Sequence, residues 1–306
     1  MVSTQSWITR LIVKYYVAPK FRRAGNSVPA WKKLMDSFVK FQRIPKGSTI
    51  NPVLINELPA EWVRVQSSHQ ECAILYLHGG AFVMGSPKTH LELAARLSAE
   101  TGTGLLVLDY RLSPEHPFPA AIEDTISAYD WLLEQGYAPE RVVIGGDSAG
   151  GSLTIQTLLA LRENGKQLPV AGFCMSPPLD WVRFDGESYQ TRARVDPWIT
   201  EEMCRFTGGL YVGEKDPATP LLNPLDMDLM GLPPLCIHTG DDEVLLSDSV
   251  RLVKHAQAAG VEVEFKIWTG MWHVFQTNAA LVPEARQSIA EISKFVMNHM
   301  HPGCSG

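Results

Sequence analysis

The sequence predicts an α/β protein in which helices cover both faces of a mostly parallel sheet. Short continuous apolar runs alternate along the chain with longer segments whose apolar residues recur every three or four positions. A strand that is buried on both faces needs an uninterrupted apolar run, so this alternation is typical of a parallel sheet between two layers of helices. A glycine-rich turn at residues 146–150, between a strand pattern and a helix pattern, fits the same class.

Each element of that sheet can be assigned from its own pattern. Five continuous apolar runs are the expected buried strands: Ala73–Leu77, Leu105–Leu108, Val142–Ile144, Val170–Met175 and Leu235–Ile237. Four segments with helical periodicity are the expected covering helices: Leu91–Leu97, Ala120–Leu133, Leu153–Leu161 and Val250–Ala258. The run Val261–Ile267 instead alternates apolar with charged residues, which predicts an edge strand with one buried face. Such an edge either faces water or pairs with a second copy of the chain.

Length and composition exclude several classes of protein. The chain has 306 residues, 45% of them apolar, with 27 Lys and Arg against 33 Asp and Glu. This length suffices for one large α/β domain with a small subdomain, and the apolar content excludes a disordered chain. A net charge of −6 argues against a nucleic-acid partner. Because no apolar run approaches the roughly 20 residues that cross a bilayer, we expect no stable membrane insertion.

Two stretches fall outside the strand–helix alternation. Residues 1–50 have a basic, helical pattern, and residues 180–215 are rich in aromatic side chains. Insertions of this size at the carboxyl edge of a sheet form lids and binding loops, so we expect the two stretches to form one helical cap. The core then comprises residues 51–179 and 216–306. For the first 25 residues we expect a helix packed on the body of the protein, the alternative being an amphipathic helix that lies on a membrane.

The cysteines indicate a reducing compartment. The five of them are odd in number and form no C-x-x-C pair: Cys72, Cys174, Cys204, Cys236 and Cys304. This pattern argues against a disulfide framework and against a zinc site. We expect buried thiols in a cytoplasmic protein.

A nucleophile is indicated by Gly146–Gly150, which matches the pattern G-x-S-x-G. A buried-strand run precedes the motif and a helix pattern follows it from Leu153. The turn is strained, needs small neighbours, and projects the serine above the sheet at a helix N-terminus. We therefore predict Ser148 as a nucleophile rather than as part of a structural glycine turn.

The serine needs a base, which in this arrangement is a histidine late in the chain. Four late histidines fall in a strand pattern, a helix pattern or the polar C-terminus: His238, His255, His299 and His301. His273 instead lies in a loop just after the alternating strand, where an imidazole can reach over the serine. His273 is the predicted base.

An acid that orients the base should lie between Ser148 and His273, just past a strand. The sequence offers three consecutive carboxylates there, Asp241, Asp242 and Glu243, and spacing does not choose among them. The other carboxylates of this cluster are expected to cap the following helix.

Donors for an oxyanion are indicated by His78-Gly79-Gly80 at the end of a buried strand. Glycines let main-chain N–H groups approach the tetrahedral oxygen without a side chain in the way. We expect the N–H groups of Gly79, Gly80 and Ala149 to form an oxyanion hole.

Together these motifs resemble the bacterial hormone-sensitive-lipase-like esterases, which are lipolytic family IV of the α/β-hydrolase superfamily. The resemblance covers most of the chain and includes His78–Phe82, Asp109–Ala121 and Gly146–Gly151. The Asp-Tyr-Arg-Leu-Ser-Pro-Glu block at 109–115 is highly specific, and Asp147 indicates the GDSAG subgroup. One departure is Ala81, which stands where the family often has a third glycine and which affects the expected alcohol-side pocket.

The resemblance implies more than the residues alone. It implies Asp242 as the acid, because the family's G-x-D places the acid two residues after a glycine, here Gly240. It also implies a cap over a hydrophobic pocket, no metal or organic cofactor, and short- to medium-chain acyl groups. The edge strand 261–267 resembles the strand through which many relatives dimerise. Three residues of the expected cap are candidates for lining the pocket, with plain packing between cap helices as the alternative: Trp198, Phe206 and Leu210.

These observations predict a serine carboxylesterase that cleaves a small-molecule ester through an acyl-enzyme. Hydrolysis of an amide, lactone or thioester is the alternative within the same chemistry, because the same machinery suits any acyl transfer. A non-catalytic small-ligand receptor on this fold is disfavoured because His273 is present beside the serine and the acid. Long-chain lipase activity is also disfavoured, since no extended apolar surface helix is evident from the sequence.

Overall fold

The computed structural model describes residues 2–65 and 68–300, and an eight-stranded sheet runs through them. The strand order is β1-β2-β4-β3-β5-β6-β7-β8, with the pairs β1–β2 and β2–β4 antiparallel and the others parallel. The strands are β1 (Ser48–Ile55), β2 (Leu58–Val65), β3 (His69–Leu77), β4 (Thr103–Leu108), β5 (Val142–Asp147), β6 (Ala171–Met175), β7 (Leu235–Gly240) and β8 (Val263–Trp268).

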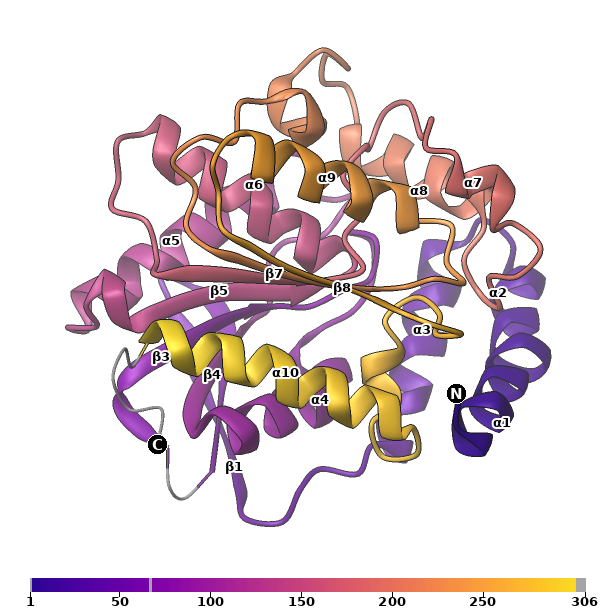
Figure 1. Ribbon diagram of the computed structural model, residues 1–306, viewed down its shortest axis with the longest axis horizontal. Helices are drawn as coiled ribbons and strands as arrows, with labels where there is room; N and C mark the ends of the chain where they lie inside the picture. Colours follow the sequence, from indigo (N-terminus) through magenta and orange to yellow (C-terminus); the bar gives the residue numbers. More distant parts are fainter. Residues whose placement is uncertain (1, 66–67, 301–306) are drawn as a thin grey trace.

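Helices cover both faces of this sheet (Figure 1). Helices α4 (Pro87–Thr101) and α10 (Pro283–Met300) lie on one face. Helices α5 (Ala120–Glu134), α6 (Ala149–Glu163) and α9 (Leu246–Ala258) lie on the other. Alternate residues of one strand serve the two layers, since Ile74 and Tyr76 pack toward α4 and α10 whereas Leu75 and Leu77 pack toward α5 and α6.

The remaining helices lie mostly at the carboxyl end of the strands (Figure 1). The N-terminal ones are α1 (Thr4–Ile12), the π-helical η1 (Val13–Val17), α2 (Ala18–Ala24), α3 (Val28–Phe38) and η2 (Val39–Phe41). Helices α7 (Ser188–Thr191) and α8 (Glu201–Val212) join them there. One apolar cluster unites the two sets, because Phe21 and Trp31 pack with Trp198 and Phe206. Short 3₁₀ turns complete the chain: η3 (Pro139–Arg141), η4 (Pro220–Leu222), η5 (Pro224–Asp226) and η6 (Phe275–Asn278).

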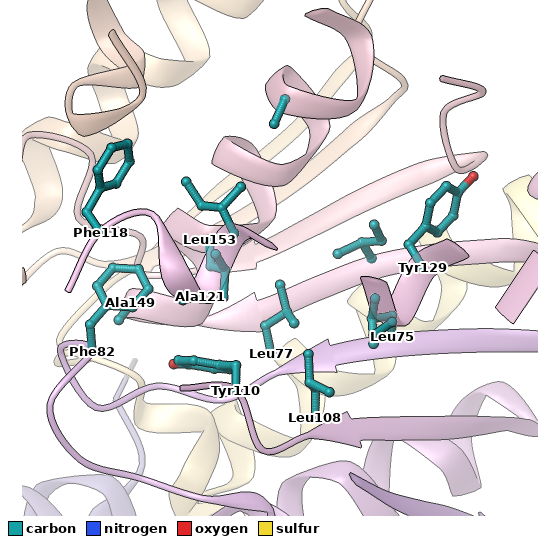
Figure 2. Close-up of a cluster of buried hydrophobic side chains, with 14 of the residues drawn as sticks. Leu75, Leu77, Phe82, Leu108, Tyr110, Phe118, Ala121, Tyr129, Ala149 and Leu153 are labelled. Carbon is teal, nitrogen blue, oxygen red and sulfur yellow. The ribbon is translucent and has the colours of Figure 1, made fainter. Parts of the chain in front are cut away.

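The main hydrophobic core extends from the sheet to the carboxyl ends of its strands. Figure 2 shows Leu75, Leu77 and Leu108 on neighbouring strands, with Phe82 and Ala149 in the segments that follow the strand ends. All five side chains are at most 1% exposed. The segments that carry the candidate site are therefore anchored in the core.

The expected strands and helices are all present, and β8 lies at an edge of the sheet as predicted. The β1–β2 hairpin was not predicted from the sequence. The hairpin strands have one partly exposed face and contain Pro52 and Pro59, so they lack a continuous apolar run. A local signal existed, because Asn56 and Glu57 form a two-residue turn with positive φ angles of 47° and 74°.

The expectation of buried thiols is confirmed for three of the four cysteines that the structure describes. Cys72, Cys174 and Cys236 are buried free thiols, and Cys204 is a half-buried one. Cys304 lies outside the described residues.

Candidate active site

Ser148 occupies a strained turn between β5 and α6. Its φ and ψ angles are 51° and −123°, a conformation that non-glycine residues rarely adopt. The turn brings the backbone of β5 and α6 against the end of β3. A Cβ atom at Gly146 would lie 2.3 Å from the Leu77 carbonyl oxygen, and one at Gly150 would lie 1.9 Å from it. Both glycines of the motif are therefore required by packing, and the strained serine between them is held above the sheet.

A continuous line of hydrogen bonds joins Ser148, His273 and Glu243. The Ser148 hydroxyl is 2.9 Å from His273 Nε2, and His273 Nδ1 is 2.9 Å from Glu243 Oε2. A neutral imidazole that donates from Nδ1 to the carboxylate keeps the Nε2 lone pair free to accept the serine proton. The arrangement therefore has the geometry of a nucleophile, a base and an acid.

Glu243 is completely buried, and donors hold it in place. Its Oε1 atom accepts hydrogen bonds from the Ser176 hydroxyl at 2.9 Å, from Gly240 N–H at 2.5 Å and from the Thr239 hydroxyl. Its Oε2 atom is thereby left for His273. These donors, together with His273, satisfy the hydrogen-bonding capacity of a buried carboxylate and fix its orientation.

The structure does not place Asp242 beside the imidazole, as the family resemblance implied. Asp242 instead forms an ion pair with Arg10, at 2.5 Å, and so ties α1 to the core. Asp241 accepts a hydrogen bond from Gly270 N–H at 2.5 Å and also does not reach His273. After β7 ends at Gly240 the chain turns sharply, and this turn directs the third carboxylate, Glu243, toward the base. Residue spacing could not distinguish the three, because the direction of each side chain depends on the turn.

The expected oxyanion hole is also partly revised. The N–H of Gly79 donates to Asp147 Oδ1 at 3.1 Å, so it is already engaged. In the described part of the chain, no hydrogen bond uses the N–H groups of Gly80, Ala81 or Ala149. Gly80 and Ala81 line the same cavity as Ser148. Ala81 has a φ of 55°, which explains why a glycine is favoured here, while its N–H remains available.

Asp147 links the glycine loop to the serine turn. This buried carboxylate accepts a hydrogen bond from the Tyr76 hydroxyl at 2.6 Å and lies 3.4 Å from His90 Nε2. Burial opposes its ionisation, but the charge and hydrogen bond of His90, together with Tyr76, bring the pKa of Asp147 below its ordinary value. Sequence reasoning did not identify His90, which no local motif marks.

His78, the first residue of the glycine loop, is a structural histidine. Its ring stacks on Tyr110 with a centroid distance of 4.3 Å, and its Nδ1 donates to the Gly79 carbonyl. Burial and the nearby His90 lower the pKa of His78 to about 3. The imidazole is therefore neutral at physiological pH.

A second residue missed from the sequence is Asp196, which connects α8 to the Glu243 turn. Its Oδ1 accepts from Trp198 N–H and Ile199 N–H, both at 2.8 Å, and its Oδ2 accepts from Val244 N–H at 3.0 Å. Burial raises the pKa of Asp196 to about 6, against the opposing effect of these backbone donors. The segment before α8 is thus fixed to the residue that follows Glu243.

A cavity of about 560 Å³ opens onto Ser148 and His273. Trp198 lines it, as expected, but Phe206 and Leu210 do not. The latter two lie on the side of α8 that packs against the N-terminal helices, and Phe206 contacts Trp31 edge-to-face at 5.5 Å. Three other residues of α8 line the cavity, Met203, Cys204 and Thr207, and Met203 also packs in the same apolar cluster as Phe206 and Leu210. The expectation for Phe206 and Leu210 was wrong because the sequence does not reveal which face of α8 meets α2 and α3.

Two further features of the described residues bear on function. Within residues 2–65 and 68–300, no three His, Cys, Asp or Glu side chains are grouped to hold a metal ion. In the same part of the chain, no helix has the length and apolar character needed to cross a membrane.

Known proteins resemble this chain in sequence and in structure. Residues 74–277 match the family model described as the α/β hydrolase fold. An acetyl-hydrolase from Streptomyces hygroscopicus is 40% identical over 253 residues, which are 83% of each chain. An esterase from Acinetobacter venetianus is 34% identical over 293 residues, covering 92% of this chain and 95% of its own. The crystal structure of an esterase from the bacterial hormone-sensitive lipase family has a TM-score of 0.92 at 38% identity, covering 98% of this chain and 99% of the other.

Proposed function

Because the chain belongs to the α/β-hydrolase fold family, among its hormone-sensitive-lipase-like esterases, we propose that it hydrolyses carboxylic esters through Ser148, His273 and Glu243. Its carboxylesterase activity follows from relatives of this length and identity. The observation that supports the residue roles is the line of hydrogen bonds from Ser148 through His273 to a fully buried Glu243.

The reaction has two acyl transfers. Ser148 Oγ attacks the acyl carbon while His273 Nε2 takes the hydroxyl proton, and Glu243 stabilises the imidazolium that forms. Collapse of the tetrahedral intermediate breaks the C–O bond, and His273 gives its proton to the departing alcohol. A water then attacks the acyl-enzyme by the same route and releases the carboxylic acid and the free serine.

The N–H groups of Gly80, Ala81 and Ala149 are the proposed donors to the oxyanion. They are unused in the described structure, and two of them line the cavity beside Ser148. Each such donor contributes on the order of 3 kcal/mol to the stability of the transition state.

The substrates are proposed to carry short- to medium-chain acyl groups. A cavity of about 560 Å³ with a mainly apolar lining supports this size. The helices in residues 1–50 and 180–215 act as the cap in this proposal, and their shared apolar cluster supports it. Trp198 is the proposed cap residue in contact with substrate.

Two further parts of the proposal concern the setting of the enzyme. The exposed edge of β8, where Ile267 is 42% exposed, is the proposed dimer interface, tested by sedimentation of the protein and of Ile267→Lys. The free thiols support a reducing compartment such as the cytoplasm.

A p-nitrophenyl ester series from acetate to palmitate, with wild type beside Ser148→Ala, tests the activity. We expect a burst and turnover on short chains, both lost in Ser148→Ala. Turnover that survived the substitution would remove Ser148 from the mechanism. A matched series of amides and lactones distinguishes the ester from the other acyl bonds.

A further inference from the structure

The N-terminal helix α1 is oriented in an unusual way: it packs its polar side chains inward. Its buried residues are Ser6 and Thr9. Ser6 donates to Glu284 Oε2 at 2.5 Å, and the backbone N–H of Ser3 donates to Oε1 of the same carboxylate at 2.6 Å. A surface helix of a globular protein normally does the reverse and buries its apolar face. The contacts of α1 with the core therefore leave Trp7, Ile8 and Ile12 exposed.

Those apolar side chains face solvent. Trp7 is 59% exposed and Tyr15 is 69% exposed. In the described part of the chain, twelve large apolar side chains are strongly exposed, and eight of them lie within residues 2–44. We call five of these the N-terminal apolar surface: Trp7, Ile8, Ile12, Tyr15 and Tyr16. This concentration differs from the scattered single exposures that are ordinary on protein surfaces.

The same segment carries a strong positive charge. Residues 1–50 contain ten Lys and Arg but only one acidic residue, Asp36, so their net charge is +9. The remaining 256 residues contain 17 Lys and Arg against 32 Asp and Glu, a net charge of −15. Among the described residues, only Arg10 and Lys32 of those ten basic residues lie within ion-pair distance of a carboxylate. Most of the positive charge is therefore uncompensated locally.

Basic side chains lie beside aromatic rings on this surface. Lys20 Nζ lies 3.7 Å from the centre of the Tyr16 ring, and Lys14 Nζ lies 5.7 Å from that of Tyr15. Exposed aromatic rings beside Lys and Arg are the composition of helices that lie in the headgroup region of a bilayer. Phosphate headgroups supply the opposite charge.

The N-terminal apolar surface is continuous with the mouth of the active-site cavity. Ile12 and Tyr16 belong to this surface and also line the cavity, although Ile12 is 46% exposed and Tyr16 is 57% exposed. Phe41 and Leu281 line it as well and are 64% and 47% exposed. Residues that are this exposed and also line a cavity stand at its opening. A flat partner that covers α1 would therefore also face the entrance to Ser148.

We propose that the N-terminal segment docks the protein on an anionic phospholipid surface, with the mouth of the cavity turned toward the lipid. Trp7, Ile8 and Tyr15 enter the headgroup boundary, while Arg22, Arg23 and their basic neighbours contact the phosphates. Both components are needed, because the apolar side chains alone give no charge preference and the basic ones alone give no anchoring. A second copy of the chain is the competing occupant, since the rest of the molecule is acidic.

Vesicle flotation with the Ser148→Ala protein tests this proposal without hydrolysis of the lipid. The probes are vesicles of phosphatidylcholine alone and of phosphatidylcholine mixed with phosphatidylglycerol. We expect binding to the phosphatidylglycerol vesicles to be at least tenfold stronger. We also expect most of it to be lost when NaCl is raised from about 0.1 M to about 1 M, which shortens the screening length from about 10 Å to about 3 Å.

Two pairs of variants separate the apolar and the charge contributions. Trp7→Gln, Ile8→Gln and Tyr15→Gln combined should lower binding at least tenfold, whereas Leu54→Gln with Met230→Gln, exposed apolar positions elsewhere, should not. Arg22→Glu combined with Arg23→Glu should also lower binding at least tenfold. The control, Lys215→Glu combined with Lys254→Glu, changes the net charge by the same amount and should have little effect on binding. Turnover of a monomeric short-chain ester by the same variants with Ser148 intact checks that each is folded, because none of these residues lines the cavity.

Three results would overturn the proposal. The first is equal binding to the two vesicle types, or no binding to either. The second is a loss of binding that is as large in the control variants as in the N-terminal ones. The third is sedimentation showing that the N-terminal substitutions dissociate a dimer without changing vesicle binding. Failure of the ester assay would affect the proposed function alone, since docking is measured in a protein without the nucleophile.

Discussion

The turns at the carboxyl ends of β5 and β7 differ sharply from the N-terminal helices that lie next to them. At the strand ends, Glu243 is fully buried and receives donors from the backbone and from two hydroxyls. In α1, by contrast, Trp7 faces solvent and the helix is tied to the body by Glu284 and by a partly exposed Arg10–Asp242 pair. The positions of the catalytic side chains are therefore set by buried contacts at the ends of the strands. The position of α1, near the entrance to the cavity, is instead set by a few partly exposed contacts.

The largest expected effect is a difference in kcat between substitutions of two adjacent carboxylates, the buried Glu243 and the partly exposed Asp242. Glu243→Gln should lower kcat by about 10³- to 10⁴-fold, because an amide neither fixes the imidazole tautomer nor stabilises the imidazolium. Asp242→Asn should leave kcat within about threefold, since Asp242 contacts Arg10 and not His273. Steady-state kinetics on p-nitrophenyl butyrate measures both. A collapse of kcat in Asp242→Asn with little change in Glu243→Gln would reverse our assignment.

A comparison between Trp198, which precedes α8 and lines the cavity, and Phe206 on α8, which does not, should give a smaller effect. Trp198→Ala removes a side chain that lines the cavity, so kcat/KM for longer acyl chains should rise about tenfold relative to acetate. Phe206→Ala removes a side chain that does not line the cavity and that packs edge-to-face on Trp31. It should reduce the free energy of unfolding by about 1 to 3 kcal/mol and leave the chain-length profile unchanged. The ester series and thermal unfolding together check this. The same chain-length profile for both variants would contradict the assignment of Trp198, and not Phe206, to the cavity wall.

The pH dependence of stability tests a buried acid behind the site. Asp248 is fully buried, and burial raises its pKa to about 7. In the unfolded chain it ionises near pH 4, so between about pH 4 and pH 7 the folded state holds a proton that the unfolded state has lost. Stability is therefore lost as pH rises through this window. Asp248→Asn removes this pH dependence. The change that it causes in the free energy of unfolding should therefore be more stabilising at pH 8 than at pH 5, by about 1 to 3 kcal/mol. Thermal unfolding of both proteins at the two pH values measures it, and a difference independent of pH would argue against the raised pKa.

The smallest effect is expected where α1 meets the body. Arg10→Gln removes the ion pair with Asp242, whose side chains are 25% and 22% exposed. A partly exposed pair contributes no more than about 1 kcal/mol, so the melting temperature should fall by about 3 °C or less and kcat should not change. The loss should shrink at high salt because screening already weakens the pair in the wild type. A drop of ten degrees or more would show that α1 holds the fold together.

Much of the fold could be predicted because it depends on local patterns. Buried parallel strands must be apolar throughout, so β3 to β7 could be predicted from their apolar runs. The alternating charges of β8 predicted that it lies at an edge of the sheet. The β1–β2 hairpin escaped because half-exposed antiparallel strands tolerate polar residues and proline. The turn at Asn56 and Glu57 was its only local mark.

The sequence by itself determined the residue types of the site and the segments that carry them. The glycines around Ser148, the loop with His273 and the cluster of three carboxylates each follow from local steric and chemical needs. Tertiary structure alone decided which carboxylate meets the imidazole, which N–H groups remain free near the serine, and which residues of α8 border the cavity. These outcomes depend on the direction of side chains and N–H bonds relative to elements far away in the chain. Adjacent residues with the same chemistry, such as Asp242 and Glu243, differ only in that direction.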